Sequence, residues 1–293
     1  EAMPRWLPWA IWGLGALLFF YGFFQRLAPS VMIDPLMREL SLDGAAVGNL
    51  SAFYFYAYAG MQIPIGLMVD RFGPRRLLTL GAVTCAVATA GFALAEDTSL
   101  AFLCRFLVGF GAGFSFVSAI TLAVRWFPPG RFAQFTGLTM MSGMIGGFLA
   151  QAPLAALVET VGWRTSLLAS AAVGLVLAAA IWMVVRDWPG GRRPGGAPGG
   201  GWRGLVRSLA SVLTRFQNVA LCLISAGLTA PMLSFAGFWG VAWLMQTQGM
   251  ERAEAGATTS LLLVGWAIGS PSAGWLSDRL NRPKAVLISA CVI

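Results

Sequence analysis

The chain has 293 residues, of which 57% are hydrophobic and only 11% are charged, and its mean hydropathy is +0.73. A soluble domain carries about 25% charged residues, so a soluble enzyme, a disordered chain and a fibrous chain are excluded. The sequence has no histidine, and its four cysteines lie inside apolar blocks, which excludes histidine-based metal sites and a disulfide scaffold. These features predict an all-α polytopic membrane protein.

Eight apolar blocks are long enough for a membrane helix, which needs about 20 residues. In chain order they cover residues 8–32, 45–68, 77–95, 100–124, 132–158, 165–185, 218–245 and 255–276, and a ninth begins at 285. Residues 189–201 contain seven Gly and three Pro, which predicts a flexible linker. After the linker, apolar residues recur at helical spacing from Trp202 to Phe216, which predicts a helix on the membrane surface.

Lys and Arg concentrate on one side of the predicted membrane. Of the 20 such residues, fifteen fall at block ends assigned to the cytoplasm and three at the opposite ends. The positive-inside rule therefore predicts a cytoplasmic N-terminus, and we expect a bacterial inner membrane protein. The arginines are spread over several loops, so the net charge of +8 does not indicate nucleic-acid binding.

The second and eighth blocks end in the same signature. After the second block it reads Gly66-Leu-Met-Val-Asp70-Arg71-Phe-Gly73-Pro-Arg75-Arg76. It returns 208 residues later as Gly274-Trp-Leu-Ser-Asp278-Arg279-Leu-Asn281-Arg282. The two copies indicate two similar halves. They resemble the loop signature of the major facilitator superfamily. The first copy matches this signature fully, and the second departs from it at Asn281, where the signature has glycine.

The fourth block carries Arg105-x-x-x-Gly109-x-Gly111-x-Gly113, which is similar to the helix-four motif of the same superfamily. The resemblance implies a transporter built from two six-helix halves. We therefore expect a complete N-terminal bundle at 1–187, a cytoplasmic linker at 188–217 and an incomplete C-terminal bundle at 218–293 that is truncated in helix nine. The family implies a monomer that needs no cofactor or metal.

The loop signature supplies candidates for gating and coupling. Gly66 and Gly274 permit close helix approach. Asp70 and Asp278 are expected at the membrane edge, where a carboxylate can accept N–H groups at a helix N-terminus or pair with an arginine, and so latch the two halves together. The other candidates in the two copies are Arg71, Gly73, Arg75, Arg76 and Arg279. Alternatively, the arginines only anchor the topology.

Arg26 lies inside the first block. An arginine there costs about 2.5–3.5 kcal/mol on insertion scales, so it is expected to face the bundle interior. Its planar fork suits a carboxylate or phosphate, and its position resembles the substrate-contacting arginine of the organic-anion and sugar-phosphate branches. The organophosphate antiporters use a second arginine in helix seven. Residues 218–245 contain no Lys or Arg, so a carboxylate fits better. A structural arginine that bonds to helix carbonyls is the alternative.

Other polar groups complete the candidate site. Tyr54, Tyr58 and Gln62 recur every four residues on one helix face, where they could bond substrate oxygens or only pack. Arg105 is expected either to support a proton path or to bond to a neighbouring helix. Asp34 is the closest carboxylate beyond the arginine of the first block, so a coupling proton is expected either there or outside this chain.

These observations favour a secondary transporter of a small organic anion, with protons or another ion and the lipid bilayer as its other partners. No ATP-binding glycine loop is present, which indicates an ion gradient as the driving force. A proton-coupled drug exporter is one alternative, although Arg26 would repel a cationic drug. A transporter-like ligand sensor is another. An enzyme is disfavoured because no nucleophile or metal constellation is present.

Overall fold

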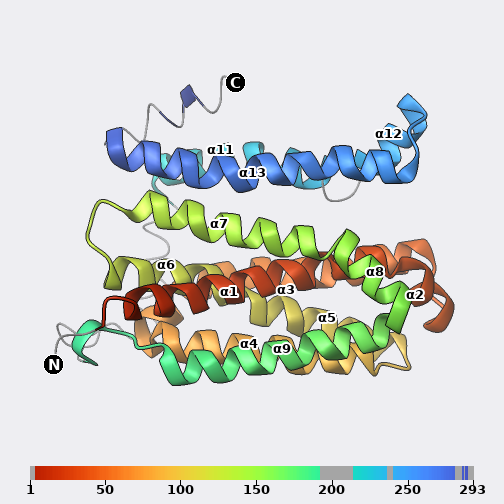
Figure 1. Ribbon diagram of the computed structural model, residues 1–293, viewed down its shortest axis with the longest axis horizontal. Helices are drawn as coiled ribbons and strands as arrows, with labels where there is room; N and C mark the ends of the chain where they lie inside the picture. The colour runs from red at the N-terminus through yellow and green to blue at the C-terminus, as the bar shows by residue number, and fades with distance from the viewer. Residues whose placement is uncertain (1–3, 192–213, 236–239, 281–285, 287, 290–293) are drawn as a thin grey trace.

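The computed structural model describes residues 4–191, 214–235, 240–280, 286 and 288–289, and this part of the chain forms helices and no strand. The elements are α1 (Leu7–Leu27), η1 (Ala28–Val31), α2 (Ile33–Glu39), α3 (Gly44–Phe72), α4 (Pro74–Ala93), α5 (Thr98–Gly113), α6 (Ser115–Trp126), α7 (Phe132–Leu149), α8 (Ala152–Val161), α9 (Trp163–Val184), η2 (Pro189–Gly191), α11 (Phe216–Ser234), α12 (Gly240–Gln248) and α13 (Arg252–Leu280). Figure 1 shows the long helices lying side by side. The all-α expectation is confirmed.

Six membrane spans can be identified in the first part of the described chain by length and apolar composition. Five are Leu7–Val31, Pro74–Ala93, Thr98–Trp126, Phe132–Val161 and Trp163–Val184. The sixth is a bent pair, Gly44–Gln62 and Pro64–Phe72, whose axes meet at 58°. Pro64 lies inside α3, and a proline removes a backbone hydrogen bond and kinks the helix. These spans correspond to the first six predicted blocks.

The later blocks are also helical where the structure describes them. The seventh contains α11 and α12, and the eighth contains α13. Over the described residues, neither of these two blocks is both apolar enough and long enough to be counted as a membrane span. In the seventh block, α11 is a shorter apolar helix over Phe216–Met232. In the eighth block, α13 includes several Ser and Thr residues. The surface helix at 202–216, most of the glycine-rich linker and the ninth block lie outside the described residues. The three domain boundaries stay predictions.

Helix α1 lies at the centre of the N-terminal bundle. It packs against α5, α6, α7 and α9, while α4 packs against α5 and α9, and α3 packs against α5. Glycines permit the closest approach. A Cβ at Gly146 of α7 would overlap the backbone of Phe20 in α1, and a Cβ at Gly109 of α5 would overlap the backbone of Tyr54 in α3. At both positions only a glycine lets the two helix backbones come this close. In Figure 1, α13 lies along the opposite side of α7.

Candidate functional site

Arg26 is buried in a cage of aromatic rings. It lies in the last turn of α1 and is 9% exposed. Its guanidinium carbon lies 4.2 Å from the ring centre of Phe23, 4.6 Å from that of Tyr58, and 5.4 Å from those of Tyr54 and Phe55. A cation–π contact contributes about 0.5–1 kcal/mol when exposed and about 2 kcal/mol or more when desolvated. The four rings therefore offset part of the cost of burying the charge.

The hydrogen bonding of Arg26 is incomplete. Its electrostatic partners are the hydroxyl groups of Tyr54 and Tyr58. The Tyr54 hydroxyl donates to the carbonyl of Gly22 at 3.0 Å, which leaves its oxygen lone pairs available to the arginine. Among the described residues, the Arg26 Nε has no hydrogen-bond partner and no acidic side chain pairs with the guanidinium. A buried cation with an unused donor is suited to hold an anionic oxygen.

Of the three polar side chains predicted to share one face of what is now α3, the structure brings two to Arg26. Tyr54 and Tyr58 stack with their ring centres 6.0 Å apart and their planes 10° from parallel. Gln62 instead donates to the carbonyl of Tyr58, one turn away on its own helix, at 3.4 Å. Two rings of the cage, Phe23 and Phe55, were not among the predicted site residues. The spacing of Phe23, three residues before Arg26 on one helix, is the signal that could have identified it.

Asp34 is one of the two expected places for a coupling proton, the other being outside this chain. It is exposed in the first turn of the short helix α2. Its backbone carbonyl accepts a hydrogen bond from the guanidinium of Arg38 at 3.3 Å. Nothing in this geometry connects the Asp34 carboxylate to Arg26, so a coupling role for Asp34 stays a prediction.

Arg105 bonds to the helix that carries Arg26. Its side chain is 2% exposed, and its Nη1 donates to the carbonyl of Gln25 at 2.8 Å. In a continuous helix this carbonyl would accept from the N–H four residues later, but that residue is Pro29, which has no N–H. The side-chain amide of Gln25 donates to Ser170 of α9 at 2.7 Å. The residue before Arg26 is thus fixed to both α5 and α9, as the structural alternative for Arg105 predicted.

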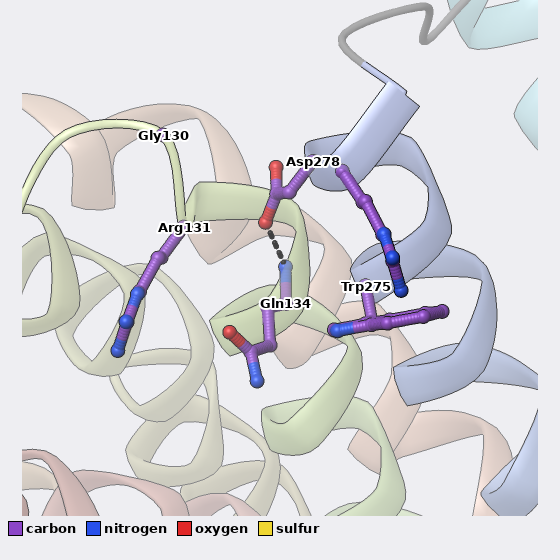
Figure 2. Close-up of a pocket in the computed structure, with 6 residues that line it drawn as sticks. Gly130, Arg131, Gln134, Trp275 and Asp278 are labelled. Atoms are coloured by element: carbon purple, nitrogen blue, oxygen red, sulfur yellow. Dashed lines mark hydrogen bonds between the residues drawn. The ribbon is translucent and has the colours of Figure 1, made fainter.

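The second copy of the loop signature joins α13 to the start of α7. Asp278 accepts the backbone N–H of Gln134 at 2.7 Å (Figure 2). It also accepts the backbone N–H of Ala133 at 3.3 Å. A Cβ at Gly274 would overlap the carbonyl of Ala133, so the two backbones are in contact there. A carboxylate is favourable at a helix N-terminus because the helix dipole is positive at that end. Both predicted contacts, the close glycine and the capping carboxylate, are present in this copy.

The first copy lacks the equivalent contacts within the described residues. Outside its own stretch of helix, no described atom lies within 4 Å of a Cβ built on Gly66. The expected close approach at this glycine therefore stays a prediction. Asp70, Arg71 and Arg76 are exposed, and no described residue makes a hydrogen bond to the Asp70 carboxylate. Their gating roles stay predictions.

Gly73 and Arg75 are instead tied to Asp187, which the sequence analysis did not select. Gly73 has a φ of +83°, and a Cβ there would overlap the Asp187 carboxylate. That carboxylate accepts the backbone N–H of Arg75 at 2.8 Å, and the Arg75 guanidinium donates to the carbonyl of Trp182 at 2.6 and 3.1 Å. The loop between α3 and α4 is therefore fixed to the end of α9, where only glycine fits beside the carboxylate.

Comparison with known proteins now identifies the family. The profile of the Major Facilitator Superfamily matches residues 14–293. The chain belongs to the Major Facilitator Superfamily. It is 25% identical to the probable sulfoacetate transporter SauU of Cupriavidus necator over 93% of the chain and 25% identical to the gallate transporter of Pseudomonas putida over 96%. It is 23% identical to the membrane sensor protein UhpC of Salmonella typhimurium over 97%. The chain spans about two thirds of these superfamily relatives, namely 65%, 68% and 67% of their lengths.

Solved structures confirm the superfamily fold. A bacterial homologue of the human lysosomal transporter Spinster matches 94% of the chain with a TM-score of 0.64 and 22% identity, and the chain covers 64% of it. The transporter FucP in its outward conformation matches 92% of the chain with a TM-score of 0.65 and 15% identity, and the chain covers 71% of it. These likenesses show the fold. The chain is therefore a membrane-spanning member of the Major Facilitator Superfamily.

Proposed function

We propose that this protein is a secondary active transporter of a small organic anion. The observation that carries the proposal is the Arg26 cage, in which a permanently charged guanidinium is buried among four rings and keeps an unused Nε donor. A buried, unpaired charge is costly, and an anionic ligand is the most direct way to compensate it. The rings of Tyr54 and Tyr58 would contact the less polar part of the same ligand.

A carboxylate is the anionic group that fits this site best. One guanidinium binds one carboxylate through two parallel hydrogen bonds, and residues 218–245 offer no second Lys or Arg. Two relatives are named for the transport of sulfoacetate and gallate, and both of these molecules carry a carboxylate. The carboxylate-bearing class is therefore our proposal for the substrate.

The loop signature supports the transport part of the proposal. Alternating access requires the two halves to part and rejoin around a central site. Asp278 and Gly274 join α13 to α7 in the way expected of a contact that forms in one state. We assign Asp70 the same role in the first copy. The distribution of Lys and Arg supports a position of both contacts on the cytoplasmic side of a bacterial inner membrane.

Counterflow in proteoliposomes tests the proposal. Vesicles that contain the intact gene product would be loaded with aromatic carboxylates, dicarboxylates, sugar acids, sulfonates and phosphate esters in turn, with imposed proton or sodium gradients to identify the coupling ion. We expect exchange of at least one carboxylate, its loss in Arg26→Gln and its weakening in Tyr58→Phe. Tyr56→Phe is the matched control, since Tyr56 lies on the same helix and is 65% exposed.

The alternatives give different results in the same assay. Binding of a carboxylate without exchange would indicate a ligand sensor. Exchange of cationic drugs, with no response to any anion, would indicate an exporter and would contradict the proposal.

A further inference from the structure

An apolar cluster adjoins the Arg26 cage on the side of α7 and α13. Phe19, Phe23 and Arg26 follow one another at spacings of four and three residues, so they share one face of α1. Phe23 belongs to both the cage and the cluster. Its ring centre lies 4.2 Å from the Arg26 guanidinium carbon and 4.9 Å from the ring centre of Phe19. The buried positive charge is therefore continuous with an apolar wall on the same helix.

Helix α7 extends this wall. Met144 is buried together with the rings of Phe19 and Phe23, and Met140, one turn earlier on α7, packs against them. A Cβ at Gly143 would overlap the Phe19 ring, so the missing side chain lets the ring lie directly on the backbone of α7. Methionine side chains are unbranched and flexible, and they adapt to ligands of different shape.

The opposite wall comes from α13. Leu263, Trp266 and Ala267 lie on one face of this helix and pack, half-buried, against the cluster. In Figure 1, α7 lies between α1 and α13. Because α13 belongs to the second half of the superfamily fold, this is a contact between the two halves. Alternating access requires such contacts to part, and the rings of Phe23 and Trp266 then become available to a ligand.

The polarity of this region favours a ligand with an apolar body. The α7 hydroxyls of Thr139 and Ser142 donate to the backbone carbonyls of Phe135 and Ala16, so neither donor is free for a ligand. A sugar acid carries several hydroxyl groups that would lose their hydrogen bonds to water on entering such a region, which is costly. An aromatic ring pairs well with phenyl and indole rings and with the sulfur of methionine.

We propose that the apolar cluster is the subsite for the body of the substrate, and that the substrate is an aromatic monocarboxylate. Its carboxylate binds to Arg26, and its ring lies between Phe23 and Trp266. Trp266 is then a specificity-determining residue that the second half supplies. This inference rests on the proposed organic-anion function and narrows its substrate class. One ligand would contact both halves, because its charge binds to α1 and its ring binds to α13.

Isothermal titration calorimetry on the intact gene product tests this subsite. The probes are phenylacetate, its saturated counterpart cyclohexylacetate, acetate, and the hydroxylated gluconate, all of which carry one negative charge. We expect phenylacetate to bind at least about 10-fold more tightly than acetate or gluconate. The ratio of phenylacetate to cyclohexylacetate affinity isolates the contact between rings. It should fall about 3- to 10-fold in Trp266→Leu and be retained in Trp266→Phe, which keeps a ring. The matched control is Trp275→Leu, since Trp275 is exposed on the same helix and lies outside the cluster.

Two results would overturn the aromatic subsite. Wild type might bind acetate or gluconate as tightly as phenylacetate, which would mean that no apolar subsite adjoins Arg26. An unchanged affinity ratio in Trp266→Leu would mean that the ring lies elsewhere. If Trp266→Leu cannot be purified, Met140→Gln, which adds a polar amide to the cluster, should weaken phenylacetate binding at least about 3-fold and leave acetate binding unchanged. Carboxylate binding that is lost in Arg26→Gln but shows no preference for a ring would refute this inference alone and leave the proposed function standing.

Discussion

The bond from Arg105 to Gln25 can be tested through Pro29, which is the reason that the Gln25 carbonyl lacks a helical partner. Arg105→Met keeps an unbranched apolar side chain but removes the donor, which leaves a buried acceptor unsatisfied at a cost of about 1–3 kcal/mol. The same change also removes a buried charge whose Nε and Nη2 have no partner among the described residues. Removing that charge is favourable, so the single variant does not isolate the hydrogen bond.

A double-mutant cycle with Pro29→Ala separates the two effects. The introduced alanine has a backbone N–H that can donate to the Gln25 carbonyl, as in a regular helix. In that background Arg105→Met still removes the charge but no longer leaves the carbonyl without a donor. We therefore expect Arg105→Met to cost about 1–3 kcal/mol less stability in the Pro29→Ala protein than in the wild type.

The assay is unfolding of the intact gene product by SDS titration in mixed micelles, followed by tryptophan fluorescence. Pro8→Ala provides the matched control, because Pro8 lies in the first turn of the same helix, where the missing N–H has no intrahelical partner to lose. The Pro8 and Arg105 cycle should show no coupling. A coupling energy below about 0.5 kcal/mol in the Pro29 cycle, which is within the additivity of independent sites, would refute the role assigned to Arg105.

Three further predictions concern the loops. Gly73→Ala should destabilise the protein by more than about 1 kcal/mol, because its φ of +83° disfavours a side chain; an unchanged melting temperature would contradict this. Asp278→Asn should slow proteoliposome transport without loss of expression, because it removes the charge at the start of α7; wild-type rates would show that the latch is dispensable. The Trp163 indole N–H and the Arg164 guanidinium lower the pKa of Glu39 below its usual 4.5. Ionised Glu39 therefore stabilises the fold at pH values above its usual pKa, and this stabilisation is lost as the pH falls through the lowered pKa. The melting temperatures of wild type and Glu39→Gln should differ at neutral pH and converge in acid.

Much of the N-terminal bundle, and the central residues Arg26, Tyr54 and Tyr58 of the site, could be predicted from the sequence. An arginine inside an apolar block must be buried or paired, which identified Arg26. A spacing of four residues placed Tyr54 and Tyr58 on one face, and the structure brings that face to Arg26. Gln62 follows at the same spacing, but its amide donates to a carbonyl of its own helix, so its place in the site stays a prediction. Periodicity along one helix does not determine which turn faces a neighbour.

Contacts between distant segments could not be predicted in this way. The fit of Gly73 against Asp187 depends on how α4 packs against α9, and no local pattern encodes that packing. The absence of an N–H at Pro29 was readable from the sequence, but the identity of the side chain that replaces it was not. The two signature glycines, Gly66 and Gly274, begin the same motif and have different surroundings, because only Gly274 faces another described helix.

The most direct test of the anion site is the affinity of Arg26 variants for the carboxylate that gives the fastest counterflow, measured by isothermal titration calorimetry on the intact gene product. Arg26→Lys keeps the charge but loses the planar fork, so we expect binding at least about 10-fold weaker. Arg26→Gln should bind about 100-fold more weakly than wild type and should still fold, since it removes an unpaired buried charge. Equal affinities of wild type and Arg26→Gln for the same carboxylate would mean that Arg26 is structural, and would contradict the assignment of an organic-anion site.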